Sequence, residues 1–253
     1  MKKKKIRWII IVLLVFIFAI CGFEVYLHFF FSEENPYDYP NSSMQTNRGS
    51  FLIDPETILE SLNNGKTGAF NLNLEQVDGE LPEVIFKGPI NWNSSEHLLI
   101  ADALNQLVWK DDLNDWQLYE MWFFLECQDN PSGFERSFMT YFKGSIAYDV
   151  RDFSIMPRYG YVEWSGGNGY PRPLLGWKKI DLKHLRIDAL NALGIAEENG
   201  GKDTRLKLNN DCNIRLFLRP EIYTGWQILY SVGTSPEFKI TIDPSSGKII
   251  HNK

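Results

Sequence analysis

The chain has 253 residues, of which 26 are basic and 32 acidic, and its formal net charge at pH 7 is -6. Residues 33–253 are more acidic still, because they hold 21 basic and 31 acidic residues, a net charge of -10. Such a surface repels nucleic acids and anionic lipids, so we expect no nucleic-acid partner.

The first predicted element is a transmembrane helix. Four lysines and Arg7 precede an apolar run from Trp8 to Phe23, and aromatic residues continue the run to Phe31. This length can cross a hydrocarbon core of roughly 30 Å, and the basic cluster is expected on the cytoplasmic side. Residues 1–31 are therefore predicted to be a single-pass anchor in the cell membrane, with an extracytoplasmic C-terminal part. A cleaved signal peptide and a lipoprotein processed at Cys21 are the alternatives.

Residues 32–50 are polar and contain proline without apolar periodicity, which predicts a linker. A first folded unit is then expected over residues 51–177. It opens with a helix signature at Asp54-Pro55-Glu56, and that short helix is predicted to end at Asn63-Asn64-Gly65.

Two later segments share a pattern and predict two similar units. Residues 97–107 and 184–193 both have helical spacing of Leu, Ile and Ala, with Ser94 or Ser95 and Asp181 as expected N-caps. Period-two patterns follow each helix and predict strands over 117–128, 134–144, 152–164, 213–219, 226–232 and 238–242. The expected fold is α+β: a transmembrane helix followed by two helix-plus-antiparallel-meander units, residues 51–177 and 178–253.

The second unit resembles a PepSY domain. The resemblance rests on the strand at 226–230 and on the closing strand from Phe238, which runs into the turn Asp243-Pro244-Ser245-Ser246-Gly247-Lys248 and then Ile249-Ile250. It implies a PepSY/cystatin-like, exported, non-catalytic module that binds or restrains peptidases, and a divergent first copy. With the Lys-rich start, it favours a bacterial surface. Turn chemistry alone also explains Asp243 and Gly247, so we expect a structural role for them.

Cysteine and histidine positions give little sign of chemistry. Cys127 and Cys212 are expected to be two buried free thiols, and a disulfide between them is the alternative. The histidines at 28, 97, 184 and 251 lack metal-ligand spacing. The acids at 111, 112 and 115 are expected in a solvated loop. We therefore predict no catalytic residues, no metal and no cofactor.

An aromatic, glycine-rich segment at residues 159–177 is the predicted ligand-binding loop. Flat rings can stack on sugars or peptides, and arginine can hold a carboxylate. The expected contacts are Tyr159, Trp164, Tyr170, Arg172 and Trp177. The alternative is that these rings fill the seam between the two units.

The sequence thus predicts a membrane-anchored, extracytoplasmic, non-catalytic binding or regulatory protein. Its expected partner is a protein at the membrane or cell envelope, for instance a peptidase that it modulates. The alternative function is a module that recognises envelope glycan or peptide, with or without hydrolase activity.

Overall fold

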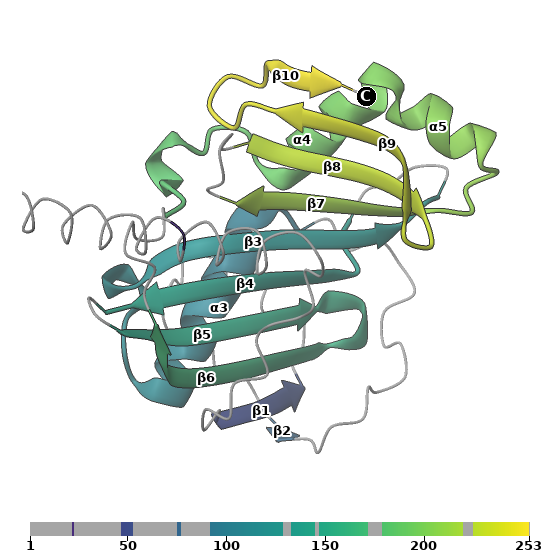
Figure 1. The fold of residues 1–253 in the computed structure, drawn as a ribbon. Coiled ribbons are helices and arrows are strands. Elements are labelled where there is room, and N and C mark those ends of the chain that lie inside the picture. Colours follow the sequence, from purple (N-terminus) through teal and green to yellow (C-terminus); the bar gives the residue numbers. More distant parts are fainter. Residues whose placement is uncertain are drawn as a thin grey trace, which may run out of the picture.

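The strands form one antiparallel sheet (Figure 1). The computed structural model describes residue 22 and residues 47–52, 75–76, 92–128, 133–144, 147–171, 179–219 and 225–252. Ten strands pair in the order β10-β9-β8-β7-β3-β4-β5-β6-β1-β2. Their bounds are β1 Asn47–Leu52, β2 Glu75–Gln76, β3 Gln117–Glu126, β4 Arg136–Lys143, β5 Ala147–Met156, β6 Tyr161–Pro171, β7 Asn213–Arg219, β8 Gly225–Val232, β9 Ser235–Ile242 and β10 Ile249–Asn252.

The expected α+β class, with a transmembrane helix and two separate helix-plus-meander units, is wrong. The protein is mostly β. Strands from both halves of the chain pair in one continuous sheet, with β3 beside β7, and so they do not form two separate units. Helices contribute only α3 (Ser94–Trp109) and the kinked pair α4 (Ala189–Ala196) and α5 (Lys202–Lys207) among the residues that the structure describes. The unit boundary expected at 177/178 falls outside those residues and stays a prediction.

The predicted anchor receives no support from the structure. Over the described ranges, no helix has the length and apolar character needed to cross a membrane. The expected span lies outside those ranges except for Gly22, as does the short helix expected after Asp54. We therefore withdraw the anchor and the single-pass location. Residues 47–50 of the expected linker, 32–50, belong to strand β1, Asn47–Leu52, and the rest of it lies outside the described residues.

One hydrophobic core lies between the sheet and the helices. Figure 1 shows α3 and α4 behind the sheet. Alternate residues of the strands point to that side, as the period of a β-strand requires. Fully buried side chains from both helices and from the central strands form a single cluster that includes Ile100, Leu104, Ala192, Leu193, Met121, Phe123, Leu125, Leu216, Ile228 and Tyr230. We call this side of the sheet the inner face.

Local capping rules explain where α3 begins. Asn93 is the N-cap: its side chain accepts from the backbone N–H of Ser95 and Glu96, and the Glu96 carboxylate accepts from the Asn93 N–H at 2.6 Å. This reciprocal arrangement satisfies amides that the helix leaves unpaired. The caps expected at Ser94 and Ser95 are therefore one or two residues too late. In the second helical segment Asp181 caps a short 3₁₀ turn, and Asp188 caps α4.

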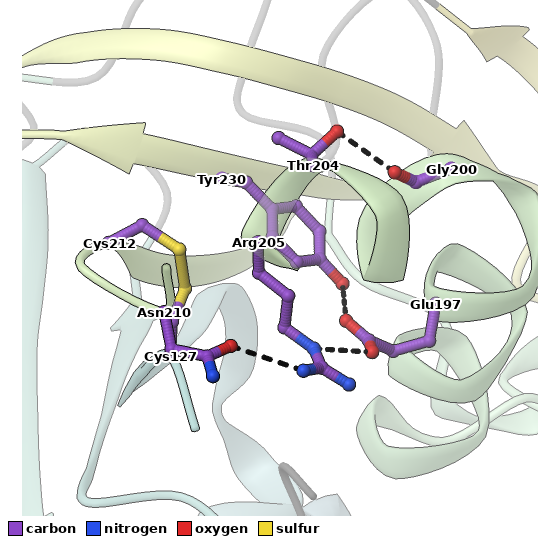
Figure 2. The surroundings of a disulfide bond; sticks show 8 residues. All are labelled: Cys127, Glu197, Gly200, Thr204, Arg205, Asn210, Cys212 and Tyr230. Atoms are coloured by element: carbon purple, nitrogen blue, oxygen red, sulfur yellow. Dashed lines mark hydrogen bonds and ion pairs between the residues drawn. A yellow bond between two sulfur atoms is a disulfide. The ribbon is translucent and has the colours of Figure 1, made fainter. Parts of the chain in front are cut away.

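The two cysteines are joined in a disulfide, so the expected free thiols are wrong. Cys127 follows β3 and Cys212 precedes β7, and their Cα atoms are 5.2 Å apart. The pairing of Glu126 with Asn213 places them opposite each other at one end of the two strands. Figure 2 shows the bridge beside Arg205, whose guanidinium contacts Glu197 and Asn210. The bond thus ties together the two strands that join the halves of the sheet.

The turn between β9 and β10 confirms its predicted structural role. Asp243 Oδ1 accepts from the backbone N–H groups of Ser245 and Ser246, each at 2.8 Å. These bonds, with the side-chain hydroxyl of Ser245 first, lower the pKa of Asp243 to about 2. Gly247 has a φ of 73°, which glycine adopts without strain. Pro244 accepts backbone bonds from Arg186 and Ile187, so the turn also holds the segment before α4.

Candidate functional site

The sheet face opposite the helices, here called the outer face, carries polar, aromatic and basic side chains in register. Three adjacent rows cross the central strands of the sheet. Because paired residues lie side by side across neighbouring strands, each row brings together residues far apart in the sequence.

The polar row consists of Ser165, Asp152, Thr140, Glu120 and Arg219, from β6, β5, β4, β3 and β7. Thr140 donates to one oxygen of Asp152 at 2.9 Å, and Ser165 donates to the other at 3.2 Å. At the far end, Arg219 Nη2 donates to Glu120 Oε1 at 2.9 Å. Arg219 Nε also lies 2.9 Å from Glu120 Oε2, as an ion pair rather than a well-directed hydrogen bond. The row therefore ends in a two-point Arg–carboxylate contact.

Asp152 is the electrostatic anomaly of this row. The residue as a whole is partly exposed, and its two carboxyl oxygens are bonded by Thr140 and Ser165. Burial raises the pKa of Asp152 to about 7, and Glu120 adds to the rise, while the bonds from Thr140 and Ser165 oppose it. No cation among the described residues pairs with it. At neutral pH this carboxyl group is therefore poised between its two protonation states.

The aromatic row lies next to the polar row and runs Ser154, Phe138, Trp122, Phe217, Gln227. The rings of Trp122 and Phe138 stack, with centroids 5.4 Å apart. The Arg136 guanidinium lies 5.9 Å from the Trp122 ring, and that of Arg219 lies 5.4 Å from the Phe217 ring. Each arginine is thus placed against an aromatic ring, an arrangement that favours cation–π attraction.

The basic row is the third and consists of Arg136, Phe124, Arg215, Leu229 and Lys239, from β4, β3, β7, β8 and β9. All five residues are partly exposed. Arg136 bonds to Ser154 at 2.9 Å and pairs with Glu163 at 3.3 Å. Basic and apolar side chains alternate along this row.

The structure describes only part of the predicted aromatic loop. Most of residues 159–177 belong to strand β6, and Arg172 and Trp177 lie outside the described residues. Tyr159 lies in the 3₁₀ turn before β6, whereas Tyr170 lies near the other end of that strand. Trp164 points to the inner face, where its ring packs against Trp109 with centroids 5.1 Å apart. A ligand role for these five residues stays a prediction.

The acids at 111, 112 and 115 are not simply a solvated loop. Asp111 pairs with Arg151 at 3.1 Å and accepts from Trp116 Nε1 at 3.1 Å. The bond from Trp116 is the main reason that the pKa of Asp111 is lowered. The Arg151 guanidinium lies between the rings of Trp109 and Trp116, at 4.5 and 3.9 Å, and donates to Asn105. This cluster fastens the end of α3 to β5 and has a structural explanation.

His97 is a core residue. It is fully buried among Trp92, Phe123 and Phe134, and its Nδ1 lies 2.7 Å from the Ser137 hydroxyl. Burial lowers the pKa of His97 to about 3, so it is neutral at physiological pH. Within the described ranges, no group of three or more His, Cys, Asp or Glu is placed to hold a metal ion.

Comparisons with known proteins found no matching family model, no similar curated protein and no similar solved structure. The PepSY resemblance therefore stays a prediction. Sequence reasoning missed the outer face, because its rows exist only once the pairing of β3 with β7 and the strand register are known. The only local signal was that polar or charged residues lie between apolar ones in some predicted strands, such as 213–219.

Proposed function

We propose that this protein is a non-catalytic binding or regulatory protein that takes a segment of a partner protein onto the outer face. The observation that carries the proposal is the pairing of arginine with aromatic rings on that face, Arg136 with Trp122 and Arg219 with Phe217. Arginine, tryptophan and tyrosine dominate the binding energy of protein interfaces. Trp122 is buried and lies in the aromatic row between Phe138 and Phe217, which are partly exposed.

The disulfide supports a role in an oxidising environment, where such bonds form and persist. Regulation of a peptidase, which the PepSY resemblance implies, is one role of this kind. The partner itself is identified only by experiment.

Site-specific photocrosslinking in the source cells tests this proposal. A photoreactive phenylalanine analogue replaces Phe217 on the outer face or, as the control, Leu107 on α3, whose side chain is 46% exposed. We expect a discrete protein adduct from position 217 and none from position 107. Equal adducts from both positions, or none from position 217, would reject the outer face as the binding surface.

A second function, recognition of envelope glycan with hydrolysis, is favoured by one observation. Asp152 and Glu120 lie on the same face two strands apart, a backbone separation of about 10 Å. Inverting glycosidases hold an acid and a base roughly 6.5 to 9.5 Å apart, and the acid has a raised pKa. If this second function is right, the wild-type protein should release reducing ends from N-acetylated oligosaccharides, and the Asp152→Asn variant should not. No release by the wild-type protein would reject it.

A further inference from the structure

The basic row shows what kind of segment the outer face can bind. Its members alternate in character: the cations Arg136, Arg215 and Lys239 are separated by the apolar residues Phe124 and Leu229. All are partly exposed, so a partner can reach them. Cations on alternate strands are about 10 Å apart at the backbone, because neighbouring strands are about 4.8 Å apart.

Among the described residues, no acid forms an ion pair with two of the three cations. Arg136 pairs with Glu163, but the ion pairs of the described residues include neither Arg215 nor Lys239. Arg215 Nη2 donates to the carbonyl of Gly233 at 3.2 Å, while its Nε is buried without a hydrogen-bond partner. The rest of the Arg215 guanidinium can still donate to a carboxylate, because this group carries five N–H donors.

Two acids near the row, Glu126 and Glu237, do not neutralise Arg215 or Lys239. Glu126 at the end of β3 and Glu237 on β9 are exposed and form no ion pair with Arg215 or Lys239. The chain as a whole has a net charge of -6, so these cations stand out against an acidic background. Complementary charge steers an acidic ligand to such a place and repels it from the rest of the surface.

We infer that the partner segment is an acidic, extended peptide whose carboxylates bind Arg215 and Lys239 and whose apolar side chains pack on Leu229 and Phe124. This inference rests on the proposed function and specifies the chemistry of the partner. A guanidinium binds a carboxylate through two parallel N–H groups, and the alkyl stems of arginine and lysine extend the apolar surface between the charges. Because successive side chains of an extended peptide point to opposite sides, the ligand must carry its acidic and apolar residues at every second position to present both to the row.

The test is fluorescence anisotropy with a labelled twelve-residue peptide that repeats Glu-Ser-Val-Ser, so that Glu and Val share one side of the extended chain. The double variant Arg215→Glu/Lys239→Glu reverses both cations. The control, Lys183→Glu/Lys207→Glu, makes the same change in net charge at two exposed lysines on the 3₁₀ turn before α4 and on α5. We expect the outer-face variant to bind at least tenfold more weakly than wild type and the control less than twofold. Wild-type binding should weaken between 50 and 500 mM salt, because salt screens exposed charges.

Three results would overturn the inference. Equal losses in the two variants would show a general charge effect, and unchanged binding by Arg215→Glu/Lys239→Glu would place the peptide elsewhere. Heparin and vesicles of phosphatidylglycerol are added as competitors at matched charge. If either competes as strongly as unlabelled peptide does, the face is a general polyanion site. If the peptide does not bind while crosslinking at position 217 still captures a partner, only the inferred acidic character of the partner segment is wrong. If both fail, the proposed function falls as well.

Discussion

Replacing Asp152 with Asn should stabilise the protein, and the gain should depend on pH. The carboxyl group has a pKa of about 7 in the folded protein against 3.8 ordinarily. The folded state therefore holds its proton more tightly than the unfolded state does. Stability from this group is fully present below pH 3.8 and is lost as the pH rises toward 7. A shift of about three units corresponds to about 4 kcal/mol at pH 8.

Asparagine keeps the shape and removes the charge. Its carbonyl can accept from Thr140, and the Ser165 hydroxyl can turn to accept from its amide. We expect Asp152→Asn to raise the free energy of unfolding by about 3–4 kcal/mol at pH 8 and by less than about 0.5 kcal/mol at pH 4. Urea unfolding followed by tryptophan fluorescence at pH 4, 6 and 8 measures both values.

The matched control is Asp149→Asn on the same strand, where the side chain is exposed. Its effect should stay within about 0.5 kcal/mol at every pH. A gain that does not change with pH, or a loss of stability at pH 8, would refute the reasoning. The carboxyl group would then be as well solvated or as well paired as in the unfolded chain.

Three further predictions concern stability. Because the pKa of His97 is about 3 in the folded state, this residue should lower stability by about 1.4 kcal/mol per pH unit from pH 6.5 toward pH 3, against the opposite contribution of Asp152 above pH 3.8; in acid urea titrations, the difference in stability between wild type and His97→Gln should show the His97 slope. Reducing the Cys127–Cys212 bond, which closes a separation of 85 residues, should lower the unfolding free energy by about 4–5 kcal/mol; a change under about 1 kcal/mol would contradict this. Arg151→Ala should lose roughly 2–4 kcal/mol, and Arg151→Lys should recover only part, because lysine lacks the planar group between the indoles. Full recovery of stability in Arg151→Lys would show that only the positive charge of Arg151 matters in this cluster.

Local rules predicted several elements well. Strand β7 has the expected bounds, Asn213–Arg219, and α3 covers the expected helix at 97–107. The turn at Asp243 follows from side-chain bonding to nearby amides and from the freedom of glycine at 247. These features depend on residues within a few positions of each other, which is the range over which sequence patterns are informative.

One local turn and the features that depend on distant pairing were not predicted. The strand expected over 152–164 is really β5 and β6, separated by Pro157–Tyr159 and by Gly160 with a φ of 54°. Proline and glycine there were a turn signal that the alternation of residues masked. The disulfide and the three rows of the outer face require β3 to pair with β7, and no local pattern contains that information.

The most direct test of the central claim is paramagnetic relaxation from a spin label on the acidic peptide. Methyl groups are observed at Leu229, in the middle of the basic row, and at Leu107 on α3 behind the sheet. We expect strong broadening of the Leu229 methyl signals at saturating peptide and unchanged Leu107 signals. Broadening of Leu107 with Leu229 unaffected would show that the peptide binds on the helical side, and the outer face would no longer be the binding surface.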